Sequence, residues 1–95
     1  MRKIVWSPSA LADLRVHFKF IQIDSPSRAA QWVERVIRSV ERLARFPRSG
    51  RIIPEIGSSR YREIIFGEYR LFYEITEREV LVFRVLHSKR LFSEL

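Results

Sequence analysis

Two Ser-Pro dipeptides, eighteen residues apart, constrain the fold of this chain more than any other feature. In each, the serine is suited to cap a helix N-terminus, and the proline fits the first helical position, where no N–H is needed. Ser7-Pro8 precedes one segment of periodic apolar residues, and Ser25-Pro26 precedes a second. The sequence therefore predicts two consecutive helices that form a hairpin.

The first predicted helix carries two lines of apolar residues. One line is spaced as a buried helical stripe: Leu11, Leu14, Phe18 and Ile21. The other consists of Val16, Phe20 and Ile23, and it provides more apolar surface than one packing contact needs. This second line either is wrapped inside the small core or forms a groove for a partner helix, and the sequence leaves both possibilities open.

The second predicted helix, which Phe46-Pro47 ends, has an apolar face and an arginine face. The apolar face is Ala29, Val33, Val36, Val40 and Leu43. The arginine face is Arg28, Arg35, Arg38, Arg42 and Arg45. Glu34 and Glu41 precede Arg38 and Arg45 by four residues, the orientation that favours ion pairs along a helix. A solvated, ion-paired face is therefore the favoured interpretation, and a nucleic-acid surface is the alternative.

The connection from Pro47 to Arg60 is fourteen residues long, which exceeds the usual loop length in a small domain. Such a loop is either functional or fixed by packing. Ile52, Ile53 and Ile56 predict that it packs against the body of the protein.

The rest of the chain is rich in aromatic and β-branched residues and predicts a three-stranded meander. Its strands are Tyr61 to Phe66, Tyr69 to Ile75, and Val80 to His87. Lys3 to Trp6 predicts a further strand at an edge of the sheet. The expected fold is α+β: one domain, residues 1–95, with an N-terminal strand and an α-helical hairpin packed on a mainly antiparallel sheet of about four strands.

Charge and composition narrow the function. Eighteen Lys and Arg against eleven Asp and Glu give a net charge of +7, and fifteen of the cations are arginine, which suggests an anionic partner. The chain has no cysteine and two isolated histidines, so neither a metal site nor a cofactor is predicted. No targeting segment or membrane span is recognisable, and a cytoplasmic location is expected.

Arg70 is the leading candidate for a phosphate ligand. If Gly67-Glu68 closes a two-residue turn, Ile65 faces Arg70, and Arg70 lies on the open face of the sheet. There it either grips a phosphate or pairs with a carboxylate of Glu63 or Glu74. Arg84, whose face the sequence does not decide, and a basic cluster at the end of the last strand lie near it: His87, Lys89 and Arg90.

Only the two histidines can transfer protons near neutral pH. His17 lies in a helix, and a structural role is expected. His87 ends a strand within the basic cluster, where neighbouring arginines would keep it neutral and suited to act as a base, although a packing role is favoured.

The ordered set of motifs resembles the ParE/RelE toxin superfamily of type II toxin–antitoxin systems. The resemblance rests on Phe46-Pro47-Arg48-Ser49-Gly50-Arg51, Ile53-Pro54-Glu55, Tyr61-Arg62-Glu63-Ile64-Ile65, Tyr69-Arg70-Leu71-Phe72-Tyr73 and Arg84-Val85-Leu86-His87. It implies a growth-inhibiting toxin of the plasmid-stabilisation type that a cognate antitoxin wraps and neutralises in a hetero-oligomer. The residues expected to bind the antitoxin are Val16, Phe20, Ile23, Arg70 and Arg84.

The two branches of the superfamily imply different targets. RelE-like members cut mRNA on the ribosome, and that nuclease here would use Arg62, Arg70, Arg90 and His87 without a metal. The second basic position of the RelE pattern falls on Ile64, however, and the tail has no tyrosine. The resemblance therefore favours the ParE branch, a non-enzymatic inhibitor of DNA gyrase. The alternatives are the ribosome-dependent endoribonuclease, a toxin fold without retained toxicity, and a simple nucleic-acid-binding module.

Overall fold

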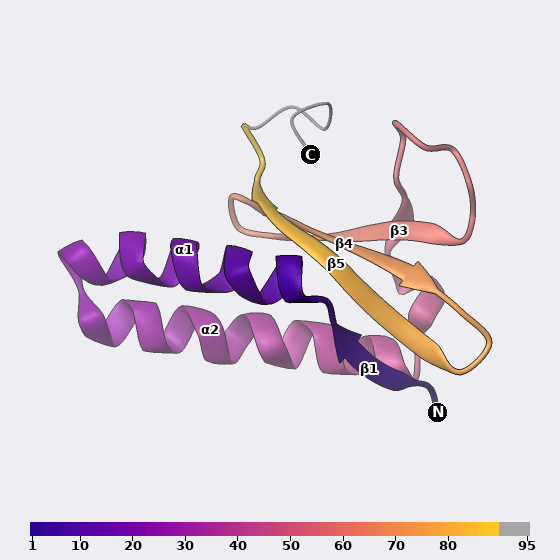
Figure 1. Cartoon of the computed structure of the whole chain (residues 1–95), viewed down its shortest axis with the longest axis horizontal. Helices are drawn as coiled ribbons and strands as arrows, with labels where there is room; N and C mark the ends of the chain where they lie inside the picture. Colours follow the sequence, from indigo (N-terminus) through magenta and orange to yellow (C-terminus); the bar gives the residue numbers. More distant parts are fainter. Residues whose placement is uncertain (90–95) are drawn as a thin grey trace.

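A helical hairpin lies on a five-stranded sheet of order β1-β5-β4-β3-β2 in this computed structural model, which describes residues 1–89 (Figure 1). The elements are β1 (Lys3–Trp6), α1 (Pro8–Asp24), α2 (Pro26–Glu41), β2 (Arg51–Ile52), β3 (Tyr61–Phe66), β4 (Tyr69–Ile75) and β5 (Glu79–His87). Two short 3-10 turns, Arg42–Ala44 and Pro47–Ser49, link α2 to β2. The predicted α+β class is confirmed.

Both predicted helix caps form. The Ser7 hydroxyl accepts a hydrogen bond from the Ala10 amide, and the Ser25 hydroxyl accepts one from the Arg28 amide. The second helix ends at Glu41, earlier than the expected stop at Phe46-Pro47, because the chain tightens into the first 3-10 turn. Because of this change, the predicted Glu41–Arg45 ion pair does not form among residues 1–89, whereas the predicted Glu34–Arg38 pair does.

The predicted hairpin register is confirmed, with Ile65 opposite Arg70 across β3 and β4. A bulge at Phe72/Tyr73 shifts the β4–β5 register. Strand β1 joins the edge of the sheet, parallel to β5, while the other pairings are antiparallel. The fifth strand, β2, lies in the long loop and was not expected, because two residues carry no alternating pattern.

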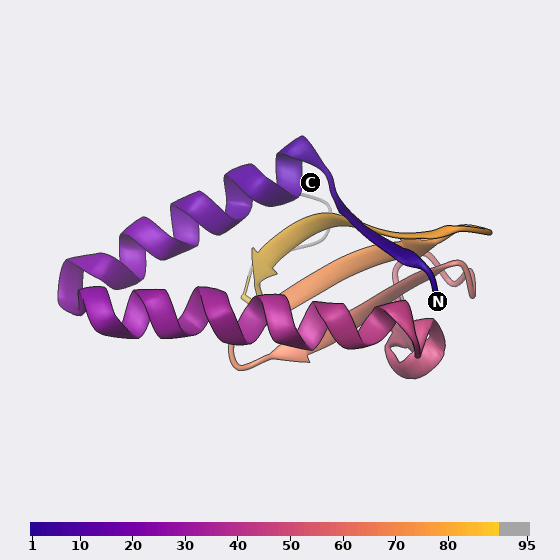
Figure 2. The same ribbon diagram turned by 90° about the horizontal axis from the view of Figure 1, so that it is seen from below.

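The helical hairpin covers one face of the sheet, and its turn projects past the strands (Figures 1 and 2). The main core lies between these layers and includes Leu14, Val36, Val40, Leu71 and Tyr73. The prediction of a buried Leu11 is wrong. Its side chain is 41% exposed and lines a groove between α1 and α2 instead of the sheet interface.

The long loop packs through one of its three isoleucines. Ile53 is fully buried in a second small cluster with Phe72 and Leu86, on the sheet face opposite the helices. Ile52 and Ile56, also expected to pack, are exposed. Ile53 is therefore the buried apolar anchor of the loop on this face.

Helix α1 takes the place of β1 along the free edge of β5. Strand β1 pairs with β5 only as far as Val82. Beyond it, the Val85 amide donates to the Asp13 carboxylate at 2.8 Å, and the Val85 carbonyl accepts from His17 Nε2 at 2.8 Å. Two side chains one helical turn apart thus satisfy the backbone hydrogen bonds of this edge, and His17 has the expected structural role.

No helix within residues 1–89 has the length and apolar character needed to cross a bilayer.

Candidate functional site

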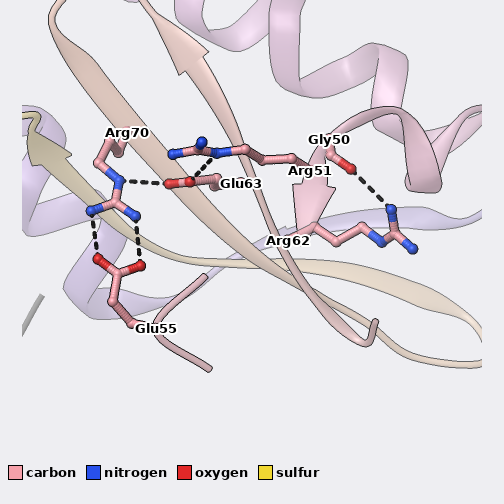
Figure 3. Close-up of polar contacts among 6 residues, drawn as sticks. All are labelled: Gly50, Arg51, Glu55, Arg62, Glu63 and Arg70. Carbon is pink, nitrogen blue, oxygen red and sulfur yellow. Dashed lines mark hydrogen bonds and ion pairs between the residues drawn. The ribbon is translucent and has the colours of Figure 1, made fainter. Parts of the chain in front are cut away.

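Arg70 of β4 is held between two carboxylates (Figure 3). Its Nε donates to Glu63 at 2.6 Å, and its two terminal nitrogens donate to the Glu55 carboxylate at 3.1 and 3.0 Å. Glu63 is fully buried and also accepts a hydrogen bond from Arg51 Nε. The four side chains form a chain of alternating charge, which we call the Arg70 network: Arg51, Glu63, Arg70 and Glu55.

This network neutralises the cation expected to bind phosphate. The hydrogen bonds that Arg70 donates to Glu55 and, to a smaller extent, to Glu63 raise the pKa of its guanidinium, and the bond to Glu55 lowers the pKa of that carboxyl. The Arg70 side chain is 11% exposed, and its guanidinium lies 4.8 Å from the centre of the Phe72 ring. The expected open face is therefore covered at Arg70, because the loop that carries Glu55 lies over it.

The Phe46–Arg51 motif closes the loop onto the sheet. The buried Tyr73 hydroxyl donates to the Pro47 carbonyl at 2.6 Å and accepts from the Gly50 amide at 3.1 Å. A Cβ at Gly50 would lie 2.5 Å from the Tyr73 hydroxyl and 2.6 Å from the Glu63 carbonyl, so only glycine fits. This contact places Arg51 opposite Glu63 in β2 and β3.

The other candidate nuclease residues lie apart from Arg70. Arg62 points to the loop, where it donates to the Gly50 carbonyl at 3.0 Å (Figure 3). It also donates to the Arg48 carbonyl at 3.2 Å. His87 lies opposite Tyr69 on the helix side of the sheet. Arg90 lies outside the described residues. Arg62, Arg70 and His87 are therefore not brought together in one site.

His87 has a different environment from the basic cluster that the sequence suggests. Its Nε2 lies 3.5 Å from the Glu68 carboxylate, and its ring contacts Tyr69 edge to face, with 5.4 Å between ring centres. The Lys89 backbone amide donates to Nδ1 at 3.2 Å. These contacts are those of a strand-end packing residue.

Arg84 also holds a carboxylate of its own chain. Its guanidinium binds Asp13 of α1 at 2.8 and 3.1 Å, and these hydrogen bonds raise its pKa. The register places Arg84 opposite Phe72, on the same sheet face as Arg70, but its guanidinium turns to the edge helix and pairs with Asp13 instead of joining the Arg70 network.

The second apolar line of α1 is exposed. Val16, Phe20 and Ile23 have exposed fractions of 64%, 71% and 81%. Of the two possibilities left open by the sequence, burial within the core is therefore excluded. We call these three residues the α1 apolar line.

The sequence alone could not identify two of the carboxylates that pair with these arginines. Glu55 is fifteen residues from Arg70, and Asp13 is seventy-one residues from Arg84. No periodicity links residues so far apart. Glu63 was identifiable, because the hairpin register places it on the same face as Arg70.

A helical hairpin on a mixed sheet is a fold already seen in a solved structure. The fold matches a solved structure described as "Chromosomal ParDE TA system from P. aeruginosa" with a TM-score of 0.78 and 17% identity, over 94% of this chain and 98% of that one.

Residues 4–92 match the sequence profile of the family described as "ParE toxin of type II toxin-antitoxin system, parDE". The chain belongs to this ParE toxin family, and its partner is a cognate antitoxin. It is also 29% identical over 92 residues to "Toxin RelE2" of Caulobacter vibrioides, across 96% of this chain and all of that protein. The resemblance seen in the sequence motifs is confirmed.

Proposed function

We propose that this toxin acts without catalysis, by binding and inhibiting DNA gyrase. The observation that carries the proposal is the pairing of Arg70 with both Glu55 and Glu63. A phosphate would have to displace two carboxylates from an arginine that is almost entirely buried. Catalysis of RNA cleavage needs a cation preorganised and free to meet charge that develops on the phosphate.

The placement of the remaining candidates supports the same proposal. Arg62 donates to loop carbonyls, and His87 lies across the sheet from Arg70, near Glu68. General acid–base catalysis needs its groups within hydrogen-bonding reach of one substrate atom. The target is taken from the resemblance to ParE-like members, which inhibit gyrase and lack the nuclease residues.

A ribosome-dependent mRNA endoribonuclease is the second candidate. Two observations favour it: Arg62, Arg70 and Arg90 match the RelE pattern, and one relative bears the name "Toxin RelE2". In this case the Arg70 network would have to open on the ribosome, and Arg70 would act as the phosphate ligand.

The α1 apolar line is the proposed contact for the cognate antitoxin. Its three side chains are largely exposed on a rigid helix, and an amphipathic helix of the antitoxin would bury them. Arg70 and Arg84 were also expected to touch the antitoxin. Both bind carboxylates of this chain, so in this proposal they support the elements that present the surface.

Expression of the chain alone in bacteria distinguishes the two candidates. We expect growth arrest with induction of a DNA-damage reporter, while protein synthesis continues in the first minutes, since gyrase inhibition breaks or entangles DNA. Arg70→Ala should still arrest growth, in proportion to the fraction of the variant that is folded. Rapid loss of protein synthesis, with A-site cuts in mRNA that disappear in Arg70→Ala, would contradict gyrase inhibition and favour the nuclease.

A further inference from the structure

A groove of about 710 Å³ runs between α2 and the β2–β3 edge of the sheet, and the proposed function does not use it. Arg35 and Arg38 of α2 form one wall together with Arg42, which begins the 3-10 turn after the helix. Arg51 of β2 lies on the other side. Glu63 is the only carboxylate among the residues that line the groove, so these residues carry a net charge of +3.

Two of these arginines have no partner of their own. Within residues 1–89, neither Arg35 nor Arg42 makes an ion pair or a side-chain hydrogen bond, and both are exposed. Arg38 pairs with Glu34 at the surface, where both side chains are more than half exposed and such a pair is weak. Glu63 is held by Arg51 and Arg70. The groove therefore presents guanidinium groups that can accept an external anion.

The spacing of the arginines suits a polyanion with closely repeated charges. Arg42 caps the C-terminus of α2, seven residues after Arg35, which places the two about 10 Å apart along the helix axis. Duplex DNA carries one phosphate charge per roughly 1.7 Å of its axis, counting both strands. Three arginines in a row along α2 and its C-terminal cap can therefore contact several neighbouring phosphates, and arginine binds phosphate in a two-pronged manner.

The floor of the groove favours a duplex over single-stranded nucleic acid. It is formed by Ile64, Ile65 and Phe66 of β3. Phe66 is the only aromatic residue in the groove, and its ring packs against the main core. Single-stranded nucleic acids are commonly held by bases stacked on exposed aromatic rings, and this groove offers no such ring.

The same floor argues against an extended acidic peptide. Strand β2 pairs only with Arg62 and Glu63, so the run from Ile64 to Phe66 at the end of β3 is left without a strand partner on that side. An added strand would gain few backbone hydrogen bonds over so short an edge.

From these observations we infer that the α2–β3 groove binds the phosphate backbone of duplex DNA, without reading its sequence. Arg35 and Arg42 are the principal contacts, and Arg38 and Arg51, which hold Glu34 and Glu63, are weaker ones. The inference does not depend on gyrase being the target, because the contact is made to DNA alone.

The test is fluorescence anisotropy of the full-length chain with a labelled 20-base-pair duplex, at a series of potassium chloride concentrations. Four neutralised phosphates correspond to a slope of log K against log salt of about −3.6, taking 0.9 per phosphate. Arg35→Ala/Arg42→Ala should reduce the size of that slope by about 1.8 and weaken binding at low salt at least tenfold. Because neither side chain has a partner, the variant should keep the melting temperature of the parent chain.

Arg15→Ala/Arg78→Ala is the matched control, because it removes the same charge at exposed sites that do not line the groove. We expect it to keep the parent slope. Equal losses in the two double variants would overturn the inference in favour of diffuse attraction by net charge. Absence of salt-dependent binding would overturn it as well, and so would tighter binding of a polyglutamate peptide or of single-stranded RNA than of the duplex through the same arginines.

Discussion

At the scale of single residues, the chemistry of Arg70 depends on which carboxylates reach it. An arginine on a rigid strand is a good phosphate ligand when its guanidinium faces solvent. Here Glu63 lies beside it in the sheet, and Glu55 arrives from the loop. The side chain becomes part of the structure that fixes the loop, and its charge is satisfied within the chain.

Removal of the buried carboxylate tests this role. Glu63→Gln leaves Arg51 without its partner and Arg70 with only Glu55, and breaking a buried ion pair from one side costs about 3 kcal/mol or more. We expect the free energy of unfolding in urea to fall by about that amount. The control is Glu74→Gln, whose pair with the exposed Arg60 should contribute less than about 1 kcal/mol. Similar losses in both variants would contradict the structural role of Glu63.

Glu55 predicts a specific dependence of stability on pH. Its pKa is lowered in the folded state, chiefly by the hydrogen bond from Arg70, relative to an ordinary value of 4.5. A carboxyl with a lowered folded pKa contributes stability above its unfolded pKa, and that contribution is lost as the pH falls through the folded pKa.

The parent chain should therefore lose stability as the pH falls below about 4.5, and Glu55→Gln should lose less over the same interval. Melting temperatures measured from pH 6 to pH 3 for both proteins provide the comparison. Identical profiles would show that the Glu55–Arg70 pair contributes nothing to the folded state.

At the scale of elements, α1 has two separate tasks on two faces. Asp13 and His17 satisfy the edge of β5 on the inner face. The α1 apolar line occupies the outer face. A substitution on the outer face can therefore change binding without disturbing the fold.

Phe20→Ser tests the outer face. The side chain is 71% exposed, so the free energy of unfolding of the toxin should change by less than about 0.5 kcal/mol. Loss of the Phe20 ring from the centre of a binding surface should weaken binding of the cognate antitoxin by about 2 kcal/mol, close to thirtyfold in Kd. Isothermal titration calorimetry measures this Kd. Lys19→Ala, at the neighbouring exposed position, should leave the Kd nearly unchanged. Unaltered antitoxin affinity in Phe20→Ser would remove this face from the interface.

The elements differ in how far the sequence could predict them. The caps at Ser7 and Ser25 and the turn at Gly67-Glu68 use local chemistry, and all three formed as expected. Strand β2 is only two residues long and depends on Tyr73 holding Gly50, so no local pattern reveals it. The parallel pairing of β1 with β5 joins residues about 76 positions apart, which local periodicity does not encode.

The same distinction applies to the site. Glu63 could be assigned to Arg70 because strand register places side chains on a face. Glu55 and Asp13 could not be assigned to their arginines, because their positions follow from the path of the loop and of α1 over the finished sheet. Long-range ion pairs of this kind follow from tertiary packing.

At the scale of the whole molecule, some arginines pair with carboxylates inside the fold, and others are left to bind partners. The chain has a net charge of +7, yet Arg51, Arg70 and Arg84 hold carboxylates within it. Arg35 and Arg42, which hold no carboxylate, line the groove beside α2, and the α1 apolar line is exposed on α1. Such a molecule is equipped to bind partners through its two helices, while the sheet behind them provides rigidity.

Supercoiling of relaxed plasmid by purified DNA gyrase, in the presence of increasing amounts of the folded toxin, tests the central claim most directly. The account predicts dose-dependent loss of supercoiling, relief on adding the cognate antitoxin, and full inhibition by His87→Ala, since no catalytic histidine is involved. Undiminished supercoiling at a large molar excess of toxin that still binds its antitoxin would contradict the account.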